Sequence, residues 1–320
     1  MAIGYLPAFK GLADAVRRAD FRNYTHVDLA FVNPGPSGKI MMDGVLVCAP
    51  AGSGSMVTDE ALREVVRKAH EAGAKILVSI GGGTVPACGG DWAQLARPEN
   101  RAKVTGGLLE LVDGYGFDGI DVDLEGELMT RMDREGTYTP LVSELSASLS
   151  ARSKLLTCAT GSYEGGMVPD AALSYFDLIG IMAYDAIGPT WGHPGDEHAS
   201  YEQAEKDLAL WLGKGVPAAK LALGLPFYGR GFGRFRPNWP LNEIADEHGR
   251  DALKSDVVGQ RCAGCDYITF NGLPTLERKA RLAGAWGAGV MVWEIDQDLP
   301  GNRAIRTVRR ALDEGRKYAR

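Results

Sequence analysis

Four carboxyl groups are crowded into the segment FDGIDVDLEGE (117–127), with apolar side chains between them. The four acids are Asp118, Asp121, Asp123 and Glu125. Successive side chains point to opposite faces of a β-strand, so the last three acids share one face and the apolar residues between them the other. A helix would scatter these acids around its circumference, because residues two apart do not face each other. We therefore predict a strand that presents three carboxyl groups to one side.

Three neighbouring carboxyl groups on a buried face have a definite chemical consequence. Burying carboxylates is unfavourable unless they share protons and hydrogen bonds. Like charges at short range force at least one of the groups to stay protonated. A protonated carboxyl group beside ionised ones is what a general acid requires. The segment therefore predicts an acid–base catalytic site.

Three other interpretations of this segment fit the sequence less well. A solvated acidic face is disfavoured by the Ile, Val and Leu that separate the acids. A calcium-binding EF-hand loop starting at Asp121 would have Met132 at its twelfth position, where a bidentate Glu is needed. The stretch GYGFDG (114–119) matches a dinucleotide-binding fingerprint, yet it precedes a strand instead of leading from a strand into a helix.

The acidic strand is one of eight short apolar runs that read as strands. They lie at 2–9, 25–34, 74–83, 117–125, 154–162, 176–185, 219–229 and 288–296. Amphipathic stretches with helix start and stop signals lie between them, at 58–73, 139–149, 200–215 and 274–287, and a last one follows at 302–316. We expect Thr58 to cap the first of these helices, and Thr139, before Pro140, to cap the second.

This alternation of strand and helix predicts a parallel sheet. Eight such units favour a closed (β/α)8 barrel of the TIM type, and a doubly wound open sheet is the alternative fold. A barrel needs roughly 250 residues, and the surplus lies mainly at 34–56, 186–199 and 233–272. Each of these stretches follows a strand, and loops after strands form the catalytic face of a barrel. We expect a single catalytic domain over residues 1–320.

Composition limits the classes of partner. The 320-residue chain carries a net charge of −6, with no run of Lys or Arg, which argues against a nucleic-acid or anionic-membrane surface. No apolar run reaches the ~18–20 residues that cross a bilayer. The sequence shows no metal-binding set and no cofactor motif, and we expect a monomer. MAIGYLPAF (1–9) leads directly into strand-like sequence, so we expect no signal peptide here, and a secreted or periplasmic location only if a leader has been removed.

Motifs on four strands together resemble glycoside hydrolase family 18, the family of chitinases and endo-β-N-acetylglucosaminidases. The pattern D-G-x-D-x-D-x-E is present at 118–125, S-x-G-G at 79–82 and M-x-Y-D at 182–185, followed by LPFYGRGF at 225–232 and a tryptophan in MVWEID at 291–296. The resemblance covers nearly the whole chain. It implies the (β/α)8 fold, with one departure: residues 233–272 allow only a short insertion between the seventh and eighth strands.

The resemblance also implies a mechanism in which the substrate supplies the nucleophile. Glu125 would protonate the glycosidic oxygen, and the sugar's own 2-acetamido group would attack the anomeric carbon. Asp123 would stabilise the resulting oxazolinium ion, with Asp121 sharing its proton, and Tyr184 would fix the acetamide. Asp118 is expected to support the start of the strand.

A second set of residues is expected to bind substrate. Trp293 would form the floor under the reacting sugar, with burial in the core as the alternative, and Asp185 would bond sugar hydroxyls or the acid pair. The set is completed by Tyr228, Met182, Tyr5, Phe31, Gly81 and Gly82. For the aromatic residues near strand ends, plain packing is an equal alternative. His193 and His198, alone in a loop, are expected at the surface.

Five cysteines leave one unpaired at least. Cys48 and Cys88 follow the second and third strands, which are neighbours in a barrel, and are expected to pair. Cys262 and Cys265 either close a tight local bridge or form half of a zinc site whose other half is missing nearby. Cys158, in mid-strand, is expected to be a buried free thiol.

The sequence thus predicts a chitinase-like hydrolase that cleaves β-1,4-linked N-acetylglucosamine in chitin or its oligosaccharides. An endo-β-N-acetylglucosaminidase acting on N-glycan cores is the first alternative. A non-catalytic chitin-binding lectin on the same barrel is the second, and the presence of Glu125 argues against it.

Overall fold

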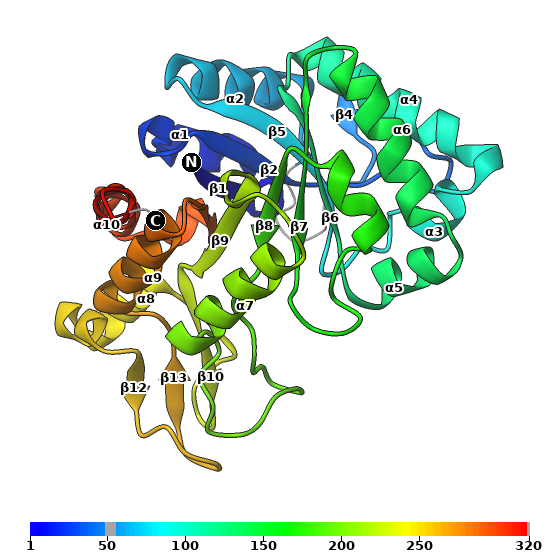
Figure 1. Cartoon of the computed structure of the whole chain (residues 1–320). Helices are drawn as coiled ribbons and strands as arrows, with labels where there is room; N and C mark the ends of the chain where they lie inside the picture. The colour runs from blue at the N-terminus through cyan, green and yellow to red at the C-terminus, as the bar shows by residue number, and fades with distance from the viewer. Residues whose placement is uncertain (49–55, 319–320) are drawn as a thin grey trace. The chain divides into compact units, whose positions relative to one another are not determined.

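A computed structural model describes residues 1–48 and 56–318 of the chain (Figure 1). Eight parallel strands close into a barrel in the order β1-β14-β9-β8-β7-β6-β5-β2. The barrel strands are β1 (Ala2–Pro7), β2 (His26–Val32), β5 (Lys75–Gly82), β6 (Gly119–Leu124), β7 (Leu155–Thr160), β8 (Leu178–Ile181), β9 (Leu221–Pro226) and β14 (Gly289–Trp293). Each strand lies within one of the eight predicted runs. The (β/α)8 prediction is confirmed, and the open-sheet alternative is wrong because the sheet closes on itself.

Helices alternate with the barrel strands along the chain. They are α1 (Leu12–Arg18), α2 (Asp59–Glu71), α3 (Trp92–Leu95), α4 (Pro98–Tyr115), α5 (Gly126–Arg134), α6 (Tyr138–Ser150), α7 (Tyr201–Gly213), α8 (Leu241–His248), α9 (Leu273–Ala285) and α10 (Arg303–Arg316). Short 3-10 helices lie at Ala8–Lys10, Phe21–Asn23, Asp170–Tyr175, Ala218–Lys220, Arg250–Lys254 and Ile295–Gln297. Within the described residues, no helix is both long enough and apolar enough to span a membrane.

The first turns of the helices show how local sequence sets their ends. Thr58 caps α2 as predicted, because its hydroxyl accepts a hydrogen bond from the amide of Ala61 (3.3 Å). The prediction for α6 is wrong by two residues: the N-cap is Thr137 and the helix begins at Tyr138, so Thr139 lies inside it. Pro140 is tolerated there because an amide in the first turn has no partner within the helix.

The chain packs as two compact units, residues 5–179 and residues 1–4 with 180–320. The single catalytic domain over residues 1–320 stays a prediction. In the unit of residues 5–179, β2, β5, β6 and β7 run side by side in parallel. Their register places Ala30, Ser79, Asp121 and Thr157 opposite one another at one level. This level carries the centre of the acidic motif.

In the other unit, β9 pairs with β14, and the start of β1 pairs with the opposite edge of β14. Residues between β9 and β14 form an antiparallel sheet of four strands in the order β11-β10-β13-β12. These strands are β10 (Tyr228–Phe232), β11 (Asn238–Pro240), β12 (Val257–Gly259) and β13 (Tyr267–Thr269). The insertion is short, as expected, but forms a paired sheet with α8 beside it, which its length alone did not predict. Figure 1 shows β10, β12 and β13 next to one another, and α9 beside α10.

Two disulfides join the predicted cysteines. Cys48 pairs with Cys88 and Cys262 with Cys265, while Cys158 is a buried free thiol. The local bridge closes the turn between β12 and β13, so the zinc alternative is wrong. The loop after β2 holds a short hairpin of β3 (Met41–Met42) and β4 (Val45–Leu46). Residues 49–55 of that loop lie outside the described residues.

Close backbone approach at the start of β6 makes Gly119 a sensitive position. A Cβ atom there would lie 2.1 Å from the carbonyl oxygen of Leu155 in β7. We predict that Gly119→Ala destabilises the protein by about 1–3 kcal/mol or more, because the strands must separate to admit the methyl group. Urea denaturation measures this loss.

Gly106 in α4 provides the matched control, because a Cβ there meets nothing within 4 Å. Gly106→Ala is expected to be neutral or to stabilise by roughly 0.5–1 kcal/mol through helix propensity. Equal effects of the two substitutions would contradict the proposed backbone constraint.

Candidate active site

Asp121 is the most heavily hydrogen-bonded acid of the β6 motif. It is 1% exposed, and three hydroxyl groups donate to it: Tyr5 Oη (2.9 Å), Ser79 Oγ (2.7 Å) and Thr157 Oγ1 (2.7 Å). Two of these donors come from the strands on either side, at the same level of the sheet. Burial raises the pKa of Asp121, and the three hydroxyl groups oppose this rise by stabilising the carboxylate.

Asp123 lies two residues further along and has far less support. It is 3% exposed, and its Oδ1 has no hydrogen-bond partner among the described residues. Burial raises the pKa of Asp123 well above its usual range, and the charges of Glu125, Asp121 and Asp28 raise it further. Asp123 therefore retains its proton more strongly than Asp121 does. These directions agree with the sequence argument that crowding keeps one carboxyl group protonated.

Asp28 is a buried acid that the sequence analysis missed. It lies in β2, is 2% exposed, and its pKa is raised well above the usual range by burial and then by the charge of Asp121. The available signal was a lone acid inside the apolar run HVDLAFV (26–32). Because the run is a barrel strand, its acid is held inside the same group of carboxyl side chains.

Glu125 differs from these three because solvent reaches it. It follows the last residue of β6, occupies the N-cap position of α5 and is half-buried. A helix N-terminus favours the negative form of a carboxyl group. A Cβ atom on Gly83 would lie 3.3 Å from Glu125 Oε1, so the chain after β5 runs directly past this side chain.

Asp118, at the other end of the motif, accepts a hydrogen bond from the amide of Ile76 (2.9 Å) and shares one with His70 (2.9 Å), in the supporting place expected for it.

Two glycines let the end of β5 approach β6 and β2. Gly81 and Gly82 have φ values of 97° and 94°, in the left-handed region. A Cβ atom on Gly81 would lie 2.5 Å from the carbonyl oxygen of Asp123, and one on Gly82 would lie 2.7 Å from the ring of Phe31. Gly81 thus lies against the acidic strand, and Gly82 lies against Phe31 of β2.

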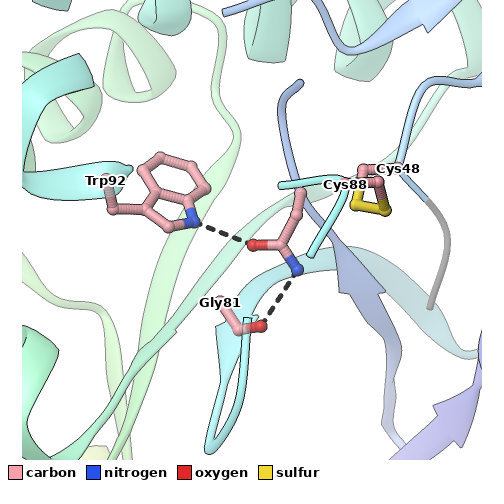
Figure 2. Close-up of a disulfide and its surroundings, with 5 residues drawn as sticks. Cys48, Gly81, Cys88 and Trp92 are labelled. Carbon is pink, nitrogen blue, oxygen red and sulfur yellow. Dashed lines mark hydrogen bonds between the residues drawn. A yellow bond between two sulfur atoms is a disulfide. The ribbon is translucent and has the colours of Figure 1, made fainter. Parts of the chain in front are cut away.

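Asn33 holds this glycine turn in place; Figure 2 labels the residues around it, Gly81, Trp92 and the disulfide of Cys48 and Cys88. Its side-chain amide donates to the carbonyl oxygen of Gly81 (3.0 Å), and its Oδ1 accepts a hydrogen bond from Trp92 Nε1 (2.8 Å). Its backbone forms an isolated β-bridge with Cys48, one end of the disulfide to Cys88. The sequence analysis named neither Asn33 nor Trp92, because only the fold brings them to Gly81.

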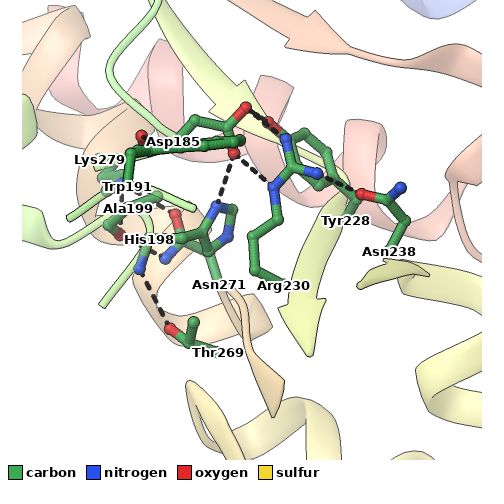
Figure 3. A network of polar contacts seen from close by, with 10 residues as sticks. All are labelled: Asp185, Trp191, His198, Ala199, Tyr228, Arg230, Asn238, Thr269, Asn271 and Lys279. Carbon is green, nitrogen blue, oxygen red and sulfur yellow. Dashed lines mark hydrogen bonds and ion pairs between the residues drawn. The ribbon is translucent and has the colours of Figure 1, made fainter. Parts of the chain in front are cut away.

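A second group of predicted residues lies in the unit of residues 180–320, around Asp185 (Figure 3). Tyr228 donates to Asp185 Oδ2 (2.9 Å), and Arg230 binds both carboxylate oxygens through Nε (2.8 Å) and Nη2 (2.7 Å). Burial would raise the pKa of Asp185, but His198 and Arg230 hold it well below its usual value. Asp185 is therefore a fixed anion, unlike the acids of β6.

The remaining predicted residues of this unit lie near the same strands. The Tyr184 ring meets that of Tyr228 edge-on at 6.1 Å, and a Cβ on Gly224 would lie 2.8 Å from Tyr184. Trp293 ends β14 and is half-buried, which leaves one part of its ring exposed for contact. Met182 is half-buried after β8.

The structure corrects the prediction for His198 and adds Arg230. His198 was expected at the surface and is wholly buried, with Nδ1 3.5 Å from Asp185 Oδ1, whereas His193 is exposed. Arg230 was not singled out, although it stands in the quoted stretch LPFYGRGF (225–232). Within residues 1–48 and 56–318, no three His, Cys, Asp or Glu side chains are grouped as they would be around a metal ion.

The buried carboxyl groups predict a pH-dependent stability. A group whose pKa is raised on folding stabilises the protein fully below its unfolded value, near 3.8 for Asp28, and this contribution is lost as the pH rises toward the folded value. The loss amounts to about 1.4 kcal/mol per pH unit for each such group. We predict that Asp28→Asn, which cannot ionise, loses less stability than the wild type above about pH 4.

Thermal denaturation from acid to mildly alkaline pH measures this difference. Asp113→Asn, at an exposed position of α4, is the control and should follow the wild-type curve. Identical pH slopes for Asp28→Asn and the wild type would refute the raised pKa of Asp28.

Known proteins resemble this chain over most of its length. It is 26% identical over 281 residues to "Probable chitinase 10" of Drosophila melanogaster, a match that covers 72% of this chain and 12% of the fly protein. It is 28% identical over 272 residues to a class V chitinase of Arabidopsis thaliana, covering 70% of this chain and 69% of the plant protein.

Solved structures agree with these sequence matches. The crystal structure of the GH18 chitinase ChiB of Flavobacterium johnsoniae superimposes with a TM-score of 0.80 at 28% identity, over 98% of this chain and 94% of that one. The family model "Glycosyl hydrolases family 18" matches residues 5–298, which include the acidic motif and Trp293. The chain therefore belongs to family 18 of the glycosyl hydrolases.

Proposed function

We propose that the protein is a chitinase, a retaining glycosidase that cleaves β-1,4 bonds between N-acetylglucosamine units. One observation carries the proposal: Asp123, buried and proton-retaining, lies between the triply hydrogen-bonded Asp121 and the solvent-reached Glu125. Asp123 is thus the carboxyl group that keeps a proton, Asp121 the one that is held in place, and Glu125 the one that a substrate can reach. Family membership and the names of the matched relatives support the same substrate class.

In the first step, Glu125 donates a proton to the glycosidic oxygen. Glu125 enters this step as a neutral acid and gives its own proton, because the proton of Asp123 is shared with Asp121. The carbonyl oxygen of the 2-acetamido group attacks the anomeric carbon, and the bond to the leaving oxygen breaks. The products are a shortened chain with a free hydroxyl group and an oxazolinium ion.

In the second step, water attacks the anomeric carbon and the oxazolinium ring opens. Glu125 takes the water proton and regains its initial state, so that the sum is addition of one water across one glycosidic bond. The two displacements on one carbon return the original β configuration. The proton of Asp123 moves to Asp121, so that Asp123 is ionised, faces the N–H of the oxazolinium ion and balances its positive charge.

The other residues hold these groups or the sugar. Asp121 steadies Asp123 and shares its proton, with Tyr5, Ser79 and Thr157 fixing the Asp121 carboxylate. By its family position, Tyr184 hydrogen-bonds the acetamide carbonyl, and Trp293 stacks beneath the sugar. Asp185 contacts sugar hydroxyls.

We also propose that the protein works as a monomer in an oxidising compartment outside the cytosol. Two disulfides support this location, because such bonds persist outside the reducing cytosol. Thiol counting on protein isolated from its native compartment tests it.

Glu125→Gln tests the acid–base role. The amide keeps the shape of the side chain but has no transferable proton, so we predict that kcat on chitin oligosaccharides falls by at least about 10²–10⁴-fold. Calorimetry should show that oligosaccharide binding persists. Activity within tenfold of the wild type would exclude Glu125 as the general acid.

Substrates without the acetamide test the source of the nucleophile. Cellotetraose and fully deacetylated chitosan oligomers have the same β-1,4 linkage but no 2-acetamido carbonyl. We predict no detectable cleavage of either compound. With chitin oligomers we predict that the first product is the β-anomer, which NMR detects during the reaction. Rapid hydrolysis of cellotetraose, or an initial α-anomer, would overturn substrate assistance.

A high-mannose glycopeptide, assayed in parallel, addresses the N-glycan alternative. Release of the glycan with no cleavage of chitin oligomers would replace the chitinase proposal by that alternative.

A further inference from the structure

Lys279 is a fully buried amine that the proposed reaction does not use. It lies in α9 with 0% of its side chain exposed. Its Nζ donates hydrogen bonds to two uncharged acceptors, the carbonyl oxygen of Ala199 (3.0 Å) and Asn271 Oδ1 (2.8 Å). Burial lowers its pKa to about 7, with partial compensation from Asp256, Asp207 and Glu202. A buried lysine is unfavourable where an apolar residue would fill the same space, so its bonds call for an explanation.

Both bonds of Lys279 lead to one backbone carbonyl. Asn271, 2% exposed, donates its side-chain amide to the same Ala199 oxygen at 2.7 Å while accepting from Lys279. The three groups form a closed triangle of hydrogen bonds, visible in Figure 3. Two side chains thus clamp a single point of the chain, just before Ser200 caps α7.

That point is the base of the loop 186–198, which follows Asp185. The amide of Ala186 donates to the carbonyl oxygen of His198 (2.9 Å), so the two ends of the loop meet. The amide of His198 donates to Thr269 Oγ1 (3.3 Å), which adds a third anchor from β13. The clamp on Ala199 therefore fixes the closed base of the whole loop.

The loop in turn holds Asp185 through its backbone and its side chain. Trp191 Nε1 donates to the backbone carbonyl oxygen of Asp185 (2.8 Å), and His198 lies 3.5 Å from its carboxylate. Asp185 itself has a φ of 60°, a left-handed conformation that is uncommon for a residue with a side chain and needs support from its surroundings. Its carboxylate then orients Tyr228 and Arg230.

We propose that Lys279 is a positioning residue: together with Asn271 it clamps the Ala199 carbonyl, and through the loop 186–198 it holds Asp185 in its working geometry. The importance of that geometry for hydrolysis rests on the proposed function. The clamp itself is a property of the structure and is tested without substrate.

Lys279→Met removes both hydrogen bonds and keeps most of the side-chain volume. Hydrogen–deuterium exchange is the first measurement, because it requires no activity. We expect the amides of Ala186 and His198 to exchange at least about tenfold faster, since the loop base is released. Leu276→Ala, a cavity in the buried face of the same helix, is the control for general destabilisation, and Arg281→Met, at an exposed position of α9 paired with Glu314 of α10, controls for loss of a positive charge.

Kinetics on chitin tetramer form the second measurement, made below the melting temperature of every variant. We expect kcat/KM of Lys279→Met to fall about tenfold, more through KM than through kcat, because the acids of β6 are untouched. When Lys279→Met is combined with His198→Gln, kcat/KM of the double variant should be little lower than that of the worse single variant. The effects of two substitutions that act through the same loop are not additive. Both control variants should keep KM within about twofold of the wild type. A purely structural role of Lys279 would not produce this difference in KM between Lys279→Met and the controls.

The outcomes separate the two proposals. Unchanged exchange at Ala186 and His198 in Lys279→Met would overturn the clamp whatever the activity. Faster exchange with wild-type KM, or losses that multiply with His198→Gln, would overturn the positioning of Asp185. Faster exchange in a protein whose wild type cleaves no chitin oligomer would refute the proposed function and support the clamp.

Discussion

Burial of carboxyl groups inside the barrel is the constraint on which the rest of the site depends. Water is excluded from Asp28, Asp121 and Asp123, so their charged forms are stable only where the protein supplies hydrogen bonds. It supplies three to Asp121 and leaves Asp123 with an oxygen to which no described residue donates a hydrogen bond. Identical side chains two residues apart thereby acquire different tendencies to hold a proton, which is the property that acid–base chemistry on a sugar requires.

The pKa of Asp185 is shifted in the opposite direction from those of the aspartates in β6. This carboxyl group is half-buried, and Arg230 binds both of its oxygens and lowers its pKa. Its partners are a guanidinium, an imidazole and a phenol, whereas those of Asp121 are three hydroxyl groups. The charge of the partner, together with the degree of burial, decides whether such an acid stays protonated or becomes a permanent anion.

Both groups of side chains are held by backbone that has little freedom. At the end of β5, Gly81 and Gly82 leave no space for a Cβ, and Asn33 fixes the Gly81 carbonyl. After β8, the loop that carries His198 is closed at its base and clamped at Ala199 by Lys279. In each case a side chain far away in the sequence binds one carbonyl oxygen. This hydrogen bond fixes the end of a loop against rigid elements of the fold.

The sequence by itself determined the eight strands, the acidic face of β6 and the pairing of four cysteines, because each is written in local periodicity, in spacing or in a recognisable motif. It did not reveal Asp28, Asn33, Arg230 or Lys279, and it placed His198 at the surface. These residues lie in ordinary-looking runs, and their roles come from partners distant in the chain: Gly81 is 48 positions from Asn33, Asp185 is 45 from Arg230 and Ala199 is 80 from Lys279. Only the tertiary structure decided which acid receives hydroxyl donors, which receives a guanidinium, and which carbonyl a buried lysine holds, because pKa and hydrogen bonding depend on neighbours in space and not on neighbours in the chain.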